Sequence, residues 1–216
     1  MLKVLKSNGL TLSLMALFAA SLVGHWLTGW RVALEDLQRH GQPPIGALAY
    51  LADPTFISTV FENWESEFLQ MSVYVVLTAY LVQRGSSESK DPDAPERDVL
   101  PSHDPQAPAL ARRSGALAWL YAHALGLALG ILFVASFVLH WTFSARAAAQ
   151  EAAEHGQAAA STLAYLADPQ LWFESFQNWQ SEFLSTAVLV VLSIFLRQKN
   201  SPESKPVAAP NSQTGA

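Results

Sequence analysis

The sequence predicts an all-α integral membrane protein with four transmembrane helices. We expect two tandem, parallel-oriented helical hairpins with short amphipathic helices on the outer side. Three observations predict this fold class. Half of the 216 residues are hydrophobic and only 14% are charged, a balance unusual for a soluble domain. Long apolar runs recur along the chain, and residues 8–90 align with 123–205 without a gap, at an offset of about 115.

This internal repeat means that the fold can be interpreted from one unit. Roughly 39 of the 83 aligned pairs are identical. The identities cluster, so that whole motifs return in the second half. The recurring segments are His25–Trp26 with His140–Trp141, His40–Gln42 with His155–Gln157, Leu48–Pro54 with Leu163–Pro169, and Asn63–Leu69 with Asn178–Leu184.

The first helix expected in each repeat is long and apolar. Leu10–Trp30 contains no acidic or basic side chain except His25. Leu117–Phe143 is a longer run that only His123 and His140 interrupt. At about 1.5 Å per residue, about 20 residues cross a hydrocarbon core of about 30 Å. Both segments are therefore predicted to span a membrane.

The second helix expected in each repeat has a shorter apolar run. Phe68–Val82 and Phe183–Leu196 hold about 15 apolar or small polar residues, and about 19 with the preceding tryptophan turn, a length that a buried soluble helix also reaches. Because each run follows a spanning helix at the same spacing, we expect it to return across the membrane. Between the two helices, Asp53 and Asp168 are expected to cap a new helix that has proline in its first position.

Lys and Arg predict the orientation. The termini and the segment between the repeats hold ten of the 13, whereas the loops inside the repeats hold only Arg31, Arg39 and Arg146. Positively charged residues favour the cytoplasmic side, so we expect both termini in the cytoplasm and the acidic loops outside. A signal peptide ending near Ser21 is an alternative for the first run, but the matching segment in mid-chain favours a structural helix.

The predicted organisation has four parts. Residues 1–84 form the first membrane hairpin and residues 116–199 the second. Residues 85–115 contain five prolines among charged and small residues, a composition that predicts a disordered cytoplasmic linker. Residues 200–216 are predicted to be a disordered tail.

Polar side chains near the outer ends of the helices are the candidate functional residues. A carboxylate deep in lipid costs about 2.5–3.5 kcal/mol, so it should face the bundle or the head groups. We expect His25 and His140 to lie at a depth similar to Glu67 and Glu182. The predicted polar seams comprise His25, Arg31, Asn63, Glu67, His140, Arg146, Asn178 and Glu182.

Two interpretations of these seams stay open. They can relay protons or bind a cation, because imidazole titrates near neutral pH and ionisable groups inside membranes are often functional. They can instead anchor the helices at the head groups, with Trp64 and Trp179 in an aromatic belt. A metal site from His40, His155 and loop carboxylates is disfavoured, because no two histidines have the short spacing of a ligand pair.

Other functions lack a signal in the sequence. The absence of cysteine excludes disulfides, thiolate metal sites and cysteine nucleophiles. No serine-hydrolase turn, phosphate-binding loop, dinucleotide motif or basic nucleic-acid-binding surface is present. We therefore predict no enzyme activity, no catalytic residue, no metal, no cofactor and no nucleic-acid partner.

Two segments carry a family resemblance. They are Asn63–Gln70 and Gln83–Lys90, the second of which returns as Gln198–Pro206. Through them, and over almost the whole chain outside the linker, the protein resembles an uncharacterised family of bacterial membrane proteins known only as a domain of unknown function. The resemblance implies a bacterial membrane protein, which we expect to be a multi-pass protein of the inner membrane. It implies no reaction.

Taken together, these features favour a non-enzymatic scaffold or envelope-associated protein of the lipid bilayer. Its partner is expected to be a second copy of the chain or another membrane protein. The alternative is a small transporter or channel, in which the seams around Asn63 and Glu67, and around Asn178 and Glu182, carry an ion.

Overall fold

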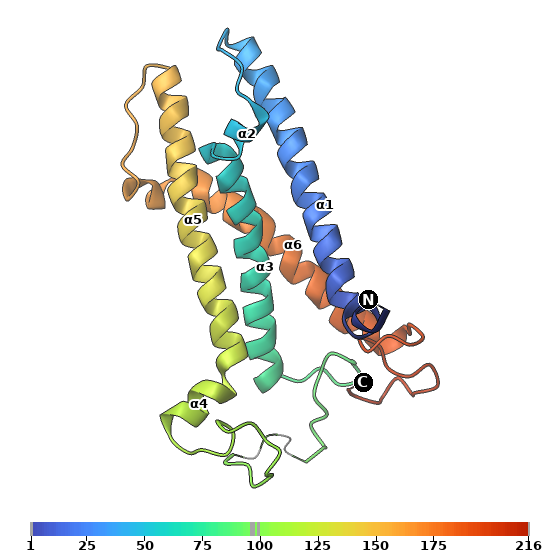
Figure 1. Cartoon of the computed structure of the whole chain (residues 1–216). Helices are drawn as coiled ribbons and strands as arrows, with labels where there is room; N and C mark the ends of the chain where they lie inside the picture. The colour runs from blue at the N-terminus through green and yellow to red at the C-terminus, as the bar shows by residue number, and fades with distance from the viewer. Residues whose placement is uncertain (1, 96–97, 99, 216) are drawn as a thin grey trace. The chain divides into compact units, whose positions relative to one another are not determined.

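The computed structural model describes residues 2–95, 98 and 100–215, and within them it contains six α-helices and no β-strand (Figure 1). This confirms the all-α fold class. Residues 96, 97 and 99 of the expected linker, including the cation Arg97, lie outside the described residues. The helices in chain order are α1 (Leu2–Arg39), α2 (Ala47–Tyr50), α3 (Pro54–Tyr80), α4 (Ala116–Ala122), α5 (Ala124–Glu154) and α6 (Pro169–Phe195), with a short 3-10 helix, η1 (Ala164–Ala167), before α6.

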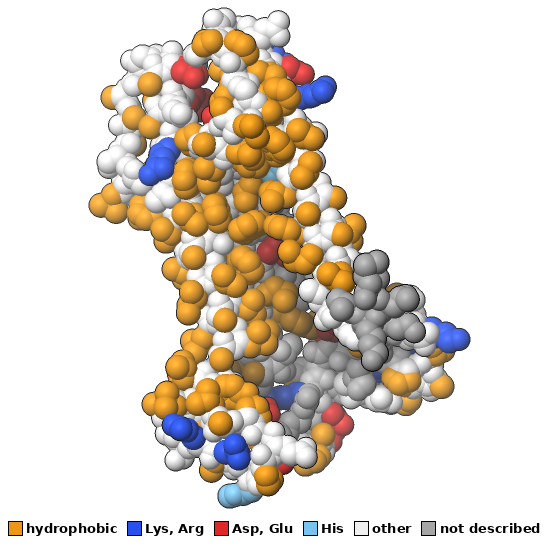
Figure 2. All heavy atoms as spheres, viewed as in Figure 1, with side chains coloured by type: hydrophobic (Ala, Val, Ile, Leu, Met, Phe, Trp, Pro, Cys, Tyr) orange, Lys and Arg blue, Asp and Glu red, His pale blue; other side chains and the backbone are white. Residues whose placement is uncertain are grey.

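Within the described part of the chain, two helices rather than the expected four have the length and composition of a membrane span. They are Ser7–Arg39 of α1 and the whole of α5, with mean hydropathies of 1.7 and 2.1 over their most apolar windows. Many of their large hydrophobic side chains are exposed, and hydrophobic side chains cover much of the face in Figure 2. α3 and α6 are 27 residues long, and the acidic residues of each lie in its first half among apolar ones.

The chain forms two compact units. The first combines Met1–Val60 with Thr142–Ala160, and the second combines Phe61–Trp141 with Ser161–Ala216. Each unit draws on both halves of the sequence repeat, and α3 and α5 contribute a segment to each unit. The division of the chain into hairpins at residues 84 and 116 stays a prediction.

In the first unit, α1 binds the short segment that follows it. Trp26 Nε1 donates a hydrogen bond to the carbonyl oxygen of Ala47 at 2.8 Å, and Trp30 Nε1 donates to that of Ile45 at 2.9 Å. Tyr50, which is 6% exposed, lies against Gly29 of α1. The absence of a side chain at Gly29 makes this contact feasible, because a Cβ there would lie 3.0 Å from the tyrosine Oη.

The two 27-residue helices α3 and α6 begin where the sequence predicts. α3 begins at Pro54 and α6 at Pro169. The preceding residues, Asp53 and Asp168, each accept a hydrogen bond through Oδ1 from the backbone N–H two residues later, at 2.9 Å in both cases. The prediction of aspartate caps followed by proline is therefore confirmed.

In the second unit, small residues bring α3 and α5 close together. A Cβ added to Gly126 of α5 would lie 3.4 Å from Val76, and one added to Gly130 would lie 3.6 Å from Ser72 Oγ. Ser72 Oγ also donates a hydrogen bond of 3.4 Å to the carbonyl oxygen of Gly126. Glycines four residues apart are typical of closely packed helices in membranes.

α3 and α6 run parallel within the second unit. Asn178 donates a hydrogen bond to Glu62, and Gln70 donates one to Thr186. Both pairs are separated by 116 residues along the chain. When the sequence separation of contacting residues stays constant along two helices, the helices run in the same direction. The separation here nearly equals the offset between the repeats. α3 and α6, which are equivalent helices of the two repeats, therefore pair with each other.

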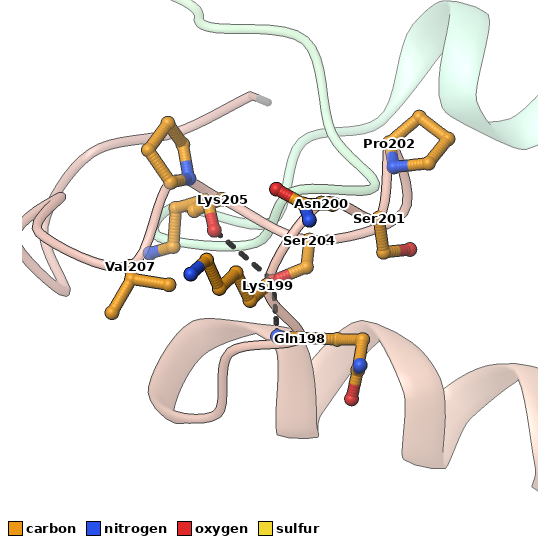
Figure 3. Close-up of a pocket in the computed structure, with 9 residues that line it drawn as sticks. Gln198, Lys199, Asn200, Ser201, Pro202, Ser204, Lys205 and Val207 are labelled. Carbon is orange, nitrogen blue, oxygen red and sulfur yellow. Dashed lines mark hydrogen bonds between the residues drawn. The ribbon is translucent and has the colours of Figure 1, made fainter.

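The same turn follows α3 and α6. Ser89 Oγ accepts a hydrogen bond from the backbone N–H of Gln83 at 3.0 Å, and Ser204 Oγ accepts one from that of Gln198 at 2.9 Å. Figure 3 shows the second turn, where these residues line a surface pocket. The serines satisfy backbone donors beyond the helix ends, which explains why this motif recurs in the sequence.

Lys205, next to the second turn, joins the tail to the start of the linker. Its side chain is buried, and Nζ donates hydrogen bonds to the carbonyl oxygens of Gly85, Asn211 and Gln213. The sequence predicts disorder for both segments from their composition. Amino-acid composition cannot predict these contacts, because they depend on the position of one lysine relative to several carbonyl groups of the folded chain.

We predict that Gly29→Val destabilises the first unit, because the added side chain collides with Tyr50. Overpacking of this kind costs about 1–3 kcal/mol. Gly24→Val is the matched control on the same helix, since a Cβ there meets nothing within 4 Å. Thermal unfolding of the two variants in detergent checks the prediction. Equal melting temperatures would contradict the close contact at Gly29.

Candidate functional site

His140 is the centre of a buried polar cluster in the second unit. Its side chain, on α5, is 0% exposed. Nδ1 lies 2.9 Å from Oε2 of Glu65 on α3, and Nε2 lies 3.2 Å from Oε2 of Glu174 on α6. One imidazole therefore bridges carboxylates from two other helices.

Each of three carboxylates in the cluster also accepts a hydrogen bond from a polar side chain nearby. The pairs are Trp179 Nε1 with Glu65 Oε1 at 3.1 Å, Asn178 Nδ2 with Glu62 Oε1 at 2.7 Å, and Gln170 Nε2 with Glu174 Oε1 at 2.8 Å. These bonds orient one oxygen of each carboxylate and leave the second oxygen for other partners.

Helix geometry explains how the cluster assembles. Glu62 and Glu65 are three residues apart on α3, so they lie on one face of that helix. Glu65 is 0% exposed, and an uncompensated charge in such a place would be strongly destabilising. Donors from His140 and Trp179 on the two neighbouring helices compensate for its burial.

Three side chains of the cluster carry donor atoms that metal ions prefer. Glu62, His140 and Glu174 each offer one such atom, and these atoms lie within 4.8 Å of one another. The sequence predicts no metal ligand, because that prediction depends on short spacing along the chain. Here the three donors come from three helices and meet only through tertiary packing.

Two of the eight residues predicted as polar seams, His140 and Asn178, belong to this cluster. Glu182, the expected partner of His140, lies instead within electrostatic reach of Glu67, and Glu65 and Glu174 take its place beside the imidazole. The remaining residue of these seams in the second unit, Asn63, is exposed.

The other three predicted residues lie in the first unit. His25 Nε2 is 3.2 Å from Thr59 Oγ1, so its observed partner is a hydroxyl where the sequence predicts a carboxylate. Arg31 is exposed. The guanidinium carbon of Arg146 lies 4.8 Å from the ring centroid of Phe143. The structure therefore shows a hydroxyl partner for one histidine and carboxylate partners for the other.

The residues that the sequence interpretation missed are those at which the repeats differ. The predicted polar seams consist of pairs that both halves keep: His25 and His140, Arg31 and Arg146, Asn63 and Asn178, and Glu67 and Glu182. The cluster instead uses carboxylates at positions where the other half carries a neutral side chain. The equivalent pairs are Glu62 and Gln177, Glu65 and Gln180, and Glu174 and Thr59. This exchange of charge between equivalent positions is the sequence signal that could have revealed them.

His40 and His155, far apart in the sequence, meet in the first unit. Their ring centroids are 6.4 Å apart. Nδ1 of each lies at hydrogen-bond distance from the carbonyl oxygen four residues earlier, at 3.0 Å and 2.8 Å. Both side chains are exposed, in contrast to His140.

Comparison with known proteins identifies one family. A family model described as a domain of unknown function (DUF6766) matches residues 1–216. No curated protein matches the chain, and no solved structure does.

We predict that Glu65→Ala strongly destabilises the second unit, because it leaves the buried donor of His140 and the half-buried donor of Trp179 without their acceptor. Each unsatisfied buried group costs about 1–3 kcal/mol, and each kcal/mol lowers the melting temperature by about 2–4 °C in a chain of this size. Gln180→Ala, at the equivalent and exposed position, is the control. Thermal unfolding in detergent should separate the two variants by at least about 5 °C, and similar melting points would argue against the cluster.

Proposed function

Because the chain belongs to the DUF6766 family, whose description names no activity, we propose from the site alone that it is an integral membrane protein that transports a small cation. One observation carries the proposal: a fully buried imidazole lies among the carboxylates of Glu62, Glu65 and Glu174. Glu65 is fully buried and Glu62 and Glu174 are half-buried, and carboxylates withdrawn from water are costly without compensating charge. A cation bound at the cluster provides that charge.

The proposed arrangement has four membrane spans in a bacterial inner membrane, with both termini in the cytoplasm. α1 and α5 have the length and hydropathy for this. For α3 and α6, the support comes from their pairing. Their polar side chains hydrogen-bond to one another, as between Gln70 and Thr186, and so need not face lipid.

The competing proposal is a non-enzymatic scaffold or envelope-associated protein that binds a membrane partner or a second copy of itself. In that case the cluster only holds helices together. The repeat favours transport, because Gln177, Gln180 and Thr59 stand at the positions equivalent to the three carboxylates. The same helix positions are thus filled by neutral side chains in the other repeat, so packing alone does not require the charges.

Cysteine labelling tests the four-span arrangement, because the chain has no cysteine of its own. With four spans, Gln157→Cys faces outward and Ser102→Cys lies in the cytoplasm. If only α1 and α5 cross the membrane, residue 157 lies in the cytoplasm and residue 102 lies outside. We therefore expect an impermeant maleimide to label Gln157→Cys in intact cells and to leave Ser102→Cys unlabelled. Ser212→Cys, cytoplasmic in both arrangements, is the control, and the reverse pattern would exclude four spans.

Reconstitution in liposomes tests transport. We expect the wild-type protein to admit cations that are followed with entrapped pH-sensitive and divalent-sensitive dyes. Glu62→Gln and Glu174→Gln should each slow this flux by at least about tenfold, corresponding to about 1.4 kcal/mol. His25→Gln changes the equivalent histidine of the other repeat, whose ring lies beside the hydroxyl of Thr59, and should retain the flux. A wild-type protein that is folded and inserted but admits no cation would favour the scaffold.

A further inference from the structure

We infer that Glu62, His140 and Glu174 form a binding site for a divalent first-row transition-metal ion such as Zn²⁺. The inference rests on the proposed function and names the class of cation that the cluster takes. Histidine nitrogen and carboxylate oxygen are both common ligands of zinc, and tetrahedral sites with three protein ligands keep a fourth position open.

The distances suit such an ion. Two ligands of a tetrahedral zinc ion, each about 2.1 Å from the metal, lie about 3.4 Å apart. His140 Nε2 and Glu174 Oε2 are 3.2 Å apart. One donor atom from each of Glu62, His140 and Glu174 lies within 4.8 Å of the other two. A small rotation of the Glu62 side chain therefore completes the set of three ligands.

The imidazole is oriented as a ligand. Glu65 accepts a hydrogen bond from Nδ1 of His140 at 2.9 Å, and Nε2 on the other side of the ring faces the ligand carboxylate of Glu174. Trp179 Nε1 in turn holds Glu65 at 3.1 Å. Histidines that bind metal ions usually donate their other N–H to a carboxylate or carbonyl oxygen, which fixes the ring and makes the ligand nitrogen more basic. Glu65 occupies that place here and acts as a positioning residue.

The ligand carboxylates are held in the same way. Asn178 donates to Oε1 of Glu62 and Gln170 donates to Oε1 of Glu174, so one oxygen of each carboxylate is held in place. All three ligands thus have a supporting partner. Such partners are common around metal sites, and their loss typically costs about 10–100-fold in metal affinity.

Charge and access also fit a divalent ion. The two ligand carboxylates cancel the charge of such an ion, while neutral imidazole adds none. The site is not sealed, since the side chain of Glu174 is 24% exposed while that of His140 is 0% exposed. An ion and one further ligand, such as water, can therefore reach the cluster from the side of Glu174.

The chemistry of the donors selects the class of metal. Imidazole suits zinc, copper, iron and nickel, whereas calcium and magnesium prefer sites made only of oxygen atoms. The chain has no cysteine, so thiolate does not compete for the ion. One nitrogen with two carboxylate oxygens is therefore expected to bind Zn²⁺ or Co²⁺ in preference to Mg²⁺ or Ca²⁺.

The test is metal binding by the full chain in detergent after removal of metals with a chelator. All proteins carry His155→Gln, which removes the exposed pair with His40 as a background site. Calorimetry should show one saturable Zn²⁺ site per chain, and Co²⁺ should give the visible absorption of a tetrahedral complex. Glu62→Gln and Glu174→Gln should weaken Zn²⁺ binding by at least about tenfold, and Glu65→Gln by about 10–100-fold. His25→Gln, the matched control, should bind as the parent protein does.

The outcomes separate this inference from transport. Saturable Zn²⁺ binding that depends on these residues, without flux in liposomes, would support the site and overturn transport. Cation flux without Zn²⁺ binding would overturn the metal site alone, as would equal binding by the parent, Glu62→Gln and Glu174→Gln. If Glu174→Gln does not elute as a folded species, Glu174→Asp replaces it, because this variant keeps the negative charge on a shorter side chain. A Zn²⁺ affinity of Glu174→Asp equal to that of the parent protein would also overturn the site.

Discussion

The hydrogen bond between His140 and Glu65 is the contact around which the second unit is organised. Both side chains are 0% exposed, and they join α5 to α3. Trp179 adds α6 through the other oxygen of the same carboxylate. In a site of low dielectric constant, each of these groups would be costly without the others. The contact also turns Nε2 of His140 toward Glu174, so the geometry of the remaining cluster follows from it.

The two repeats keep the same contacts for folding and differ in their chemistry. Trp26 and Trp141 each donate to a carbonyl oxygen 21 residues later, at 2.8 Å in both cases. The aspartate caps and the serine turns after the long helices recur as well. By contrast, His25 lies beside a threonine hydroxyl and His140 beside two carboxylates. The two repeats thus share their folding contacts, whereas His25 and His140 have different polar partners in the described residues. The repeat accounts for the fold and does not account for the cluster.

Parallel pairing of α3 and α6 bears both on the cluster and on whether these two helices can lie in a membrane. Taken alone, each helix carries its acidic residues in its first half. Taken together, polar groups on one helix bind polar groups on the other, as Glu62 binds Asn178 and Gln70 binds Thr186. The hydropathy of a helix depends on its own residues alone and so does not include hydrogen bonds between polar side chains of two helices. The same pairing places Glu62 near His140, so helix packing and site formation have a common cause.

The sequence by itself determined the helical class, the family and the local signals. Aspartate followed by proline marks the start of α3 and α6 because capping involves only residues next to each other in the chain. The apolar runs of α1 and α5 are equally local. Only the tertiary structure decided the partners of the histidines. His140 meets Glu65 across 75 residues and Glu174 across 34, and no spacing rule relates them. Sequence comparison between the repeats placed His25 and His140 in the same role because both are kept. Packing gave them different neighbours, since the contacts of a buried side chain depend on which helices lie against it and on which of their residues carry a charge.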